Sequence, residues 1–218
     1  LNITRLLAKV LITAGFNADN YQDIDRFLNP KMEEILDYKG LTSPEELNKS
    51  FVRIKQAIDN NEKVYINGDP DADGISGTTV LAAGLRQLGL HVTYEFPVRS
   101  KEGHGLQLRI IQQAKKHGAT LIVTTDCGTK DVEAVQYAND QNMDVIITDH
   151  HILGKALPNA TAIINPYLNT DPKNEEYRYL SGSYVSFKWI MGLKDYLGVT
   201  FPKQIFECLV ICSALGVV

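Results

Sequence analysis

Apolar residues follow two different patterns along the chain, and the change between them comes shortly after residue 60. Before it, 3–14 is rich in apolar residues and 44–60 carries them at helical spacing, whereas 23–36 is a short helical stretch broken at Asn29-Pro30. Ser43, followed three residues later by Glu46, matches a capping box at the start of the last segment. The pattern predicts an N-terminal part made of helices.

From Lys63 onward, short apolar runs alternate with helical segments. Strand-like runs occupy 64–66, 92–96, 121–125, 145–148 and 162–164. Helical patterns lie between the earlier runs, at 77–88, 106–117 and 130–141, and another follows at 185–197. Repeated units of this kind predict an α/β fold with a doubly wound, mainly parallel sheet and flanking helices. In such a sheet, ligands bind just past the carboxyl ends of the strands.

Three acidic residues alternate directly after the first of these strands, in the segment Gly68-Asp69-Pro70-Asp71-Ala72-Asp73-Gly74. Carboxylates this close repel one another unless a cation neutralises them. A solvated acidic turn is one alternative, and the opening of an EF-hand calcium loop is another. The EF-hand does not fit, because its twelfth position is Val80 instead of a glutamate and because a strand precedes the motif. We therefore favour a divalent-metal site.

The end of the third strand carries another acid, in Thr125-Asp126-Cys127-Gly128. An aspartate at this place is often only the N-cap of the next helix, so its position beside the first motif decides between the two roles. Cys127 is a conceivable soft ligand, but oxygen-rich surroundings favour hard ions. Asp126 is thus the candidate ligand of this motif.

The fourth strand ends in Asp149-His150-His151. Imidazole mixed with carboxylates suits Mn²⁺, Zn²⁺ or Fe²⁺ better than an all-oxygen Mg²⁺ site. A ligating histidine also needs its other ring nitrogen held by a carboxylate or carbonyl, a role that Asp149 could fill. Three such motifs on strand ends of one sheet are difficult to explain as turns or core.

Other chemistries lack their sequence signals. The chain has no GxxxxGK[ST] phosphate loop and no GxSxG nucleophile motif, and Gly103-His104-Gly105 lacks the third glycine of a dinucleotide fingerprint. The three cysteines form no CxxC pair, which argues against disulfides and zinc knuckles. The chain has no apolar run long enough for a membrane span and no signal-peptide pattern, so we expect a soluble, cytoplasmic protein without membrane contact.

The net charge of −4 is unusual for a protein that binds nucleic acid. Five acids lie in the motifs above, however, and without them the formal charge becomes +1. Composition therefore neither supports nor excludes a polyanionic substrate.

Together the motifs resemble those of the DHH phosphoesterase superfamily, named for its Asp-His-His motif, and within it the RecJ-like single-strand nucleases. The resemblance extends over nearly the whole chain. Besides the Asp149-His150-His151 motif, the segments that carry it are Phe27-Leu28-Asn29-Pro30, Gly68 to Gly74, Glu102-Gly103-His104-Gly105-Leu106, Thr125 to Gly128 and Ile164-Asn165-Pro166.

The resemblance implies a site for two Mn²⁺ or Mg²⁺ ions, with Asp126 as the bridge between them. The implied ligands are Asp71, Asp73, Asp126 and His150. It also implies that Asp69 is a further ligand or base and that His151 contacts the scissile phosphate. The implied reaction is hydrolysis of single-stranded DNA from the 5′ end by water activated between the ions, in repair or recombination. Expected contacts to the nucleic-acid backbone, for which solvated charge is the alternative, are Arg99, Lys101, His104 and Arg109.

Two departures from the family pattern concern the end of the chain. Tyr184 stands where the family has a second glycine, which puts a close backbone approach to phosphate there in doubt. The family's fourth motif, with a further metal-binding aspartate, follows a segment like 214–218, where this chain stops. We therefore expect a helical segment over 1–60 packed on a truncated DHH domain over 61–218, without the substrate-clamping C-terminal domain. Alone, these residues should be weakly active or inactive.

Three functions remain as hypotheses. The first is a single-strand-specific 5′ exonuclease, and the second is a phosphodiesterase for short oligonucleotides or cyclic dinucleotides. The third is a non-catalytic module that binds nucleic acid or a replication or repair protein. Intact candidate ligands argue against the third.

Overall fold

A computed structural model describes residues 3–17, 19 and 21–217, so Val218 lies outside the described residues. The chain divides into two compact units, Leu1–Asp37 and Tyr38–Val218. The smaller unit holds three helices, α1 (Arg5–Thr13), α2 (Tyr21–Leu28) and α3 (Met32–Leu36). Within it, the ion pair of Arg26 with Glu34, 2.9 Å long, joins α2 to α3. The expected helical character of this segment is confirmed.

The larger unit is built on a parallel sheet in the order β2-β1-β3-β4-β5. Its strands are β1 (Lys63–Gly68), β2 (His91–Glu95), β3 (Ala119–Thr125), β4 (Asp144–Thr148) and β5 (Ala162–Ile164). The doubly wound, parallel α/β fold that the sequence predicts is thus confirmed. The chain winds outward from β1 to β2 and then crosses back to β3, so the topological switch point lies between β1 and β3.

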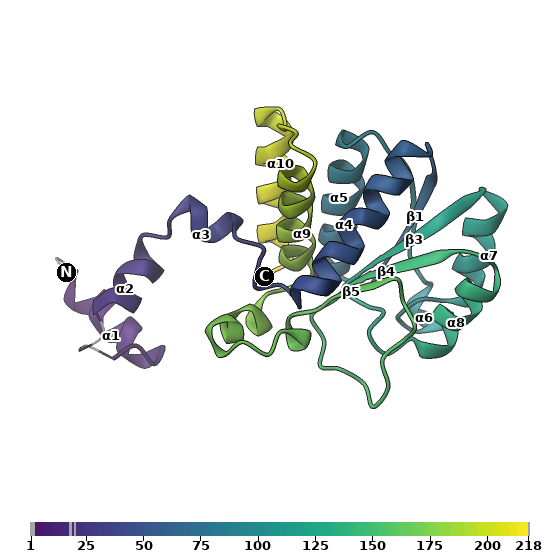
Figure 1. The fold of residues 1–218 in the computed structure, drawn as a ribbon. Coiled ribbons are helices and arrows are strands. Elements are labelled where there is room, and N and C mark those ends of the chain that lie inside the picture. Colours follow the sequence, from purple (N-terminus) through teal and green to yellow (C-terminus); the bar gives the residue numbers. More distant parts are fainter. Residues whose placement is uncertain (1–2, 18, 20, 218) are drawn as a thin grey trace. The chain divides into compact units, whose positions relative to one another are not determined.

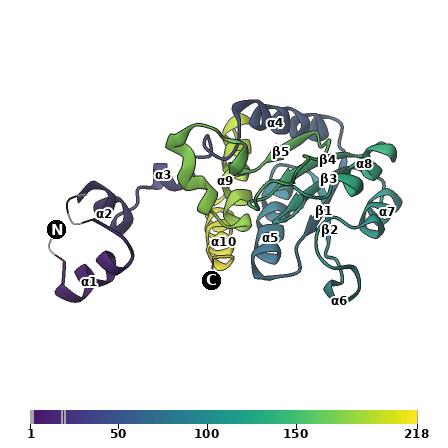
Figure 2. The same ribbon diagram turned by 90° about the horizontal axis from the view of Figure 1, so that it is seen from below.

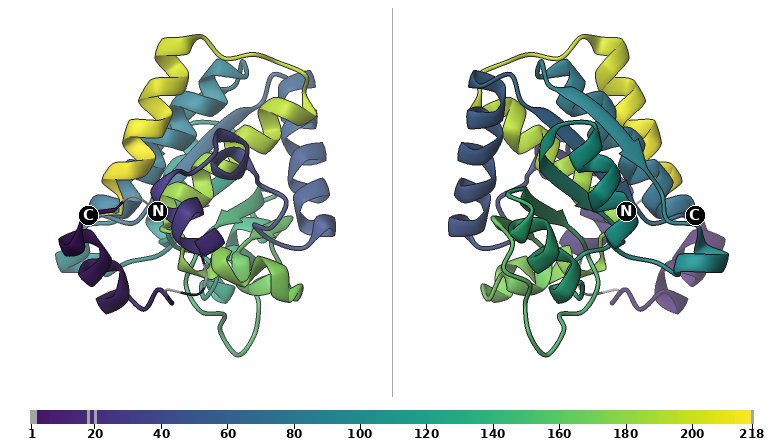
Figure 3. Two further views of the ribbon diagram at one scale, coloured as in Figure 1. Left: turned by 90° about the vertical axis from the view of Figure 1, so that its left-hand side faces the viewer. Right: turned by 90° about the vertical axis from the view of Figure 1, so that its right-hand side faces the viewer.

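Helices cover both faces of the sheet (Figures 1 and 2). One face carries α4 (Pro44–Asp59), α5 (Ala72–Gln87) and α9 (Gly182–Tyr196), and α10 (Lys203–Leu215) packs outside α5 and α9 (Figure 3). The other face carries α7 (Leu108–Lys116) and α8 (Val132–Asp140), and the short α6 (Arg99–Glu102) precedes α7. Two 3₁₀ helices, η1 (Pro166–Leu168) and η2 (Pro172–Tyr179), connect β5 to α9. No helix in the described part of the chain is both long and apolar enough to cross a membrane.

Alternate residues of β1, β3 and β4 supply the two halves of the core, whereas the edge strand β2 has no buried residue. Tyr65, Ile122 and Val145 belong to the buried cluster that includes residues of α7 and α8. On the opposite face, Trp189 of α9 is fully buried and its indole N–H donates to Ser50 Oγ of α4 at 2.9 Å. Val185, Trp189 and Leu193 of α9, which share one predicted helix face, are all fully buried. The sheet between these layers positions the strand ends rigidly.

Three local details differ from the sequence prediction. Helix α5 begins at Ala72, because Asp71 caps it by accepting the Gly74 N–H at 3.0 Å, so Asp73 lies in the first turn of a helix. The capping box of α4 is only half formed: Ser43 caps the helix, whereas Glu46 accepts the N–H of Ile163 in β5 at 2.7 Å. Finally, α6 and α10 have no counterpart in the prediction.

Candidate metal centre

The three acidic motifs meet at the carboxyl edge of the sheet. The first residue beyond each strand still donates its backbone N–H to the neighbouring strand: Asp69 to Thr125, Asp126 to Thr148 and Asp149 to Ile164, at 3.0–3.3 Å. The sheet ladder therefore fixes the backbone of all three acids. Asp69 and Asp126 follow β1 and β3, so they flank the topological switch point where this architecture binds ligands.

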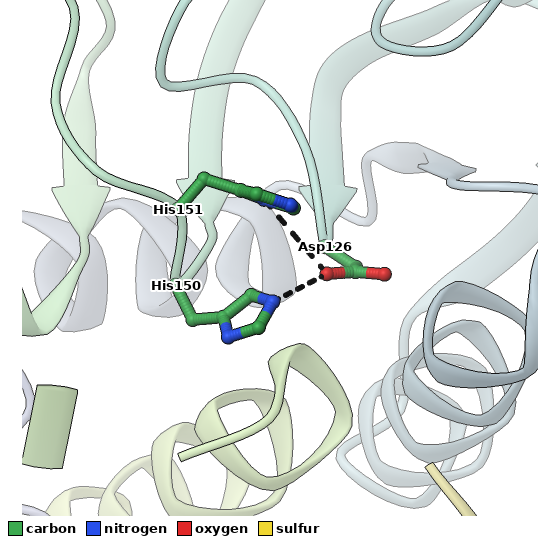
Figure 4. A group of neighbouring side chains, drawn as sticks. All are labelled: Asp126, His150 and His151. Carbon is green, nitrogen blue, oxygen red and sulfur yellow. Dashed lines mark ion pairs between the residues drawn. The ribbon is translucent and has the colours of Figure 1, made fainter. Parts of the chain in front are cut away.

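Asp126 lies at the middle of the site. It is 4% exposed and adopts a left-handed backbone conformation with φ 59°, which a non-glycine residue takes only at a cost of about 1–2 kcal/mol. His150 Nε2 lies 3.0 Å from Asp126 Oδ1 and His151 Nδ1 lies 4.0 Å from it (Figure 4). Among the described residues, none donates a well-aligned hydrogen bond to this buried oxygen. A buried carboxylate oxygen without a donor fits a cation site.

Two groups of side chains have the spacing of metal ligands, and both include Asp126. One joins it to His150 and His151, and the other joins it to Asp69 and Asp71, with the ligand atoms of each group within 4.8 Å of one another. The sequence-predicted residues Asp69, Asp71, Asp126, His150 and His151 are thus brought together. Carboxylates shared between adjacent ions are the usual architecture of sites that hold two metals.

Asp73 lies at the edge of this arrangement. Its carboxylate accepts the N–H groups of Gly182 and Ser183 at 2.7 and 2.8 Å, at the start of α9. Asp73 Oδ2 remains 3.8 Å from His150 Nε2. A Cβ on Gly182 would come within 2.7 Å of Asp126 Oδ1, so only glycine allows this approach of α9 to the centre. The close backbone approach is therefore made at Gly182, before Tyr184.

Hydrogen bonds determine which ring nitrogen of each histidine faces the centre. His150 Nδ1 lies 2.8 Å from the carbonyl oxygen of Leu180, which can only accept, so Nδ1 carries the proton and Nε2 is left for a metal. His151 Nδ1 lies 2.8 Å from Asp149 Oδ1. Because an ionised carboxylate can only accept, Nδ1 of His151 also carries a proton. Asp149 thus orients His151, whereas a backbone carbonyl orients His150. Such outer partners set the tautomer and the direction of a ligating or phosphate-binding imidazole.

Asp149 also organises the loop that carries the histidines. Its carboxylate accepts the backbone N–H groups of His150, His151 and Thr129 at 2.8, 3.2 and 3.0 Å. Burial opposes its ionisation, but the hydrogen bonds from His151 and Thr129 outweigh burial and lower the pKa of Asp149 to about 2. Asp149 is therefore a permanent anion at neutral pH.

A cleft of about 280 Å³ opens beside the centre. The cleft is lined by candidate site residues: Asp69, Asp71, Asp126, Asp149 and His151, together with Arg99 and His104.

Two expected backbone contacts are not among the lining residues. Lys101 lies on α6, and the Arg109 guanidinium binds Glu102 at 2.6 and 3.0 Å and also pairs with Glu95. Sequence reasoning missed two lining residues, Lys130 and Asp131, because a charge at the start of a helix is an ordinary feature. Cys127 also lines the cleft, with its thiol buried against the side-chain amide of Asn67.

The arrangement matches a known family. The profile of the DHH family, N-terminal domain, aligns with residues 63–213, which contain every element of the sheet and the centre. The chain belongs to the DHH family.

Relatives in the DHH family include nucleases. The chain is 36% identical over 191 residues to the single-stranded-DNA-specific exonuclease RecJ of Bacillus subtilis, covering 86% of this chain and 23% of that protein. A crystal structure of exonuclease RecJ bound to manganese is similar with a TM-score of 0.68 at 27% identity, covering 80% of this chain and 44% of that one. RecJ of Thermus thermophilus in complex with Mn²⁺ gives a TM-score of 0.62 at 25% identity, covering 82% and 25%. The chain spans between 23% and 34% of the curated relatives it matches.

Titration of the DHH centre differs from that of ordinary surface groups. Burial, together with the charge of Asp73, raises the pKa of Asp126 to about 6 although His150 opposes the rise. Contact with the Asp126 carboxylate raises the pKa of His150 to about 8. Burial and the neighbouring Asp71 raise the pKa of Asp69. Without a metal, the centre therefore retains protons at neutral pH.

This retention predicts that Mn²⁺ binding releases protons. His150 is mainly protonated at neutral pH, so a metal must displace that proton, and its apparent affinity should rise from pH 6 to pH 8 as Asp126 and then His150 ionise. Isothermal titration calorimetry in two buffers with different ionisation enthalpies measures the number of protons released. A binding heat independent of the buffer would contradict the prediction.

Proposed function

We propose that this DHH domain forms the centre of a metal-dependent phosphodiester hydrolase that acts on single-stranded DNA from its 5′ end. The observation that carries the proposal is the sharing of Asp126 between two groups with ligand spacing. The relatives named as single-stranded-DNA-specific exonucleases support the choice of substrate. Solved RecJ structures with Mn²⁺ and Mg²⁺ support the choice of ion.

The donor set suits two hard or borderline cations. Asp126 would be the shared ligand, with His150 and Asp73 on one side of it and Asp69 and Asp71 on the other. Bound there, divalent ions would supply Lewis-acid polarisation of the phosphoryl group and lower the pKa of water. The mixed nitrogen and oxygen ligands favour Mn²⁺ over Mg²⁺, which prefers a site made of oxygen ligands alone.

The side chains around the ligands have separate tasks. Asp149 holds His151 by Nδ1, which leaves Nε2 to donate a proton or hydrogen bond to an oxygen of the scissile phosphate. The bond to Asp149 raises the pKa of His151, which favours the donating, protonated form. Asp69 lines the same cleft as Asp126, where its carboxylate would either ligate the second ion or accept a proton from water. Arg99 brings a positive charge and His104 a ring N–H donor to the same cleft for a backbone phosphate.

Arg109 has a different task from the one expected of a backbone contact. Its ion pairs with Glu102 and Glu95 occupy the guanidinium, so we propose that it acts by holding α6 and does not itself bind the phosphate backbone. The hydrogen bond with Arg109, followed by that with the Val98 N–H, lowers the pKa of Glu102 to about 2.

An assay of substrate length tests the proposal. The full-length protein is incubated with Mn²⁺ and either a long 5′-phosphorylated single strand of DNA or dinucleotides. Duplex DNA serves as the control. We expect stepwise cleavage of the long single strand and little cleavage of the duplex. Preference for dinucleotides would assign the DHH centre to small phosphodiesters, and absence of any Mn²⁺-dependent cleavage would refute hydrolysis.

A further inference from the structure

One wall of the cleft is formed by a connecting segment, residues 96–107, which runs from the end of β2 to the start of α7 and is called the arm below. The arm supplies Arg99, His104 and Gly105 to the lining of the cleft. Asp69, Asp71 and Asp126 line the same cleft, so the arm brings the Arg99 guanidinium and the His104 imidazole to the candidate metal centre.

The first half of the arm is held by ion pairs. Arg109 of α7 binds both carboxylate oxygens of Glu102, at 2.6 and 3.0 Å. Glu102 in turn accepts the Val98 N–H at 2.8 Å. A bidentate arginine–carboxylate pair with a further backbone contact fixes direction as well as distance. This attachment holds α6, which carries Arg99.

A side chain from another part of the chain contacts the second half of the arm. Asp131 Oδ2 accepts the Leu106 N–H at 2.6 Å. Asp131 occupies the N-cap position of α8, yet its side chain makes no hydrogen bond to its own helix. An aspartate at an N-cap ordinarily accepts such a bond, worth about 1 kcal/mol. Here that bond is replaced by one that spans 25 residues.

Gly105 makes this contact sterically demanding. Its φ is 85°, and a Cβ placed on it would lie 2.7 Å from Asp131 Oδ2. The arm thus passes against the Asp131 carboxylate with no room for a side chain. His104 directly precedes this point, so the place where the arm is attached also sets the position of His104.

We propose that Asp131 is a positioning residue for the substrate: by holding the Leu106 amide, it keeps His104 at the cleft wall beside Arg99, where the two bind a phosphate next to the one that is cleaved. The identity of this ligand rests on the proposed function. Within the part of the chain that the structure describes, Asp131 makes no hydrogen bond or ion pair with a candidate metal ligand. Its loss therefore affects substrate binding and leaves the metal centre intact.

The test compares Asp131→Ala with Asp131→Asn, and Glu133→Ala serves as a control because Glu133 is an exposed acid on the same helix. Asparagine retains a side-chain oxygen that accepts the Leu106 N–H, whereas alanine does not. For Asp131→Ala we expect about tenfold weaker binding of a 5′-phosphorylated single-stranded phosphorothioate oligodeoxynucleotide and a similar rise in KM, the value of one lost charged hydrogen bond. Affinity for Mn²⁺ and kcat should stay within about twofold, and Asp131→Asn and Glu133→Ala should resemble the wild type.

Amide hydrogen exchange reports the attachment of the arm without any substrate. The Leu106 N–H should exchange faster in Asp131→Ala than in the wild type, because it loses its acceptor. Unchanged oligonucleotide binding in Asp131→Ala, or a loss of Mn²⁺ affinity equal to the loss of oligonucleotide binding, would overturn the proposal. A wild type that binds the oligonucleotide in an Asp131-dependent manner but does not cleave single strands would refute hydrolysis and leave the positioning role standing.

Discussion

Replacing Asp126 by asparagine should abolish Mn²⁺-dependent cleavage while leaving the protein folded. Asparagine has the same shape but no charge, so both ligand groups lose the anion they share. Several kcal/mol of charge stabilisation in the transition state correspond to a loss of roughly a thousandfold or more in kcat. Steady-state nuclease assays and Mn²⁺ titrations measure the two losses, which should occur together.

Stability provides the control for this variant. The folded-state pKa of Asp126 is raised to about 6, so the stability that its protonation contributes is present at low pH and is lost as pH rises through that value. At neutral pH the ionised, buried carboxylate therefore burdens the metal-free fold. Asp126→Asn removes this burden but also the contact that raises the pKa of His150, so the two effects oppose each other and we expect a melting temperature without metal close to that of the wild type. Asp195→Asn, at an exposed position of α9, should change neither activity nor stability. Unfolding of Asp126→Asn would show that Asp126 is structural.

The two histidines should separate into different kinetic classes. His150 is held by the Leu180 carbonyl with Nε2 3.0 Å from Asp126, whereas His151 is held by Asp149 and is more exposed, 52% against 28% of the side chain. His150→Ala should therefore weaken Mn²⁺ binding by about a hundredfold and reduce kcat further. His151→Ala should retain Mn²⁺ affinity within about threefold and lose roughly a hundredfold in kcat, as expected for a lost contact to the transition-state phosphate.

Mn²⁺ affinity and turnover are measured separately for each variant, by calorimetry and by single-turnover cleavage. His104→Ala is a useful comparison, because His104 lines the same cleft outside both ligand groups. Equal losses of Mn²⁺ affinity in His150→Ala and His151→Ala would contradict the division of roles and would make both residues ligands.

The fold could be predicted from the sequence because its signals are local. Buried strands such as 121–125 and 145–148 are mainly apolar runs, and an aspartate follows directly at the end of each of these two. The parallel arrangement follows from the helices between the strands, and it places Asp69, Asp126 and Asp149 at one edge. The helical pattern predicts a helix only from residue 77, since the sequence does not show that Asp71 caps a helix that already contains Asp73.

The contacts around the centre could not be predicted, because they join segments that are distant in sequence. The carbonyl of Leu180 reaches His150 across 30 residues, and Asp131 reaches Leu106 across 25. In the sequence, Arg109 looks like any solvent-exposed cation of a helix. The fold brings Glu95 and Glu102 to its guanidinium. The roles assigned to individual side chains of the site stay predictions, and the variants above test them one by one.

The most direct test of the account is the location of the metal. Crystals of the protein soaked in Mn²⁺ and measured near the manganese absorption edge give an anomalous difference map that shows each ion. The account predicts a peak within coordination distance of Asp126 and His150, with a second peak bounded by Asp69, Asp71 and Asp126 when two ions bind. Mn²⁺ peaks only at other acidic groups, with none at Asp126, would contradict it.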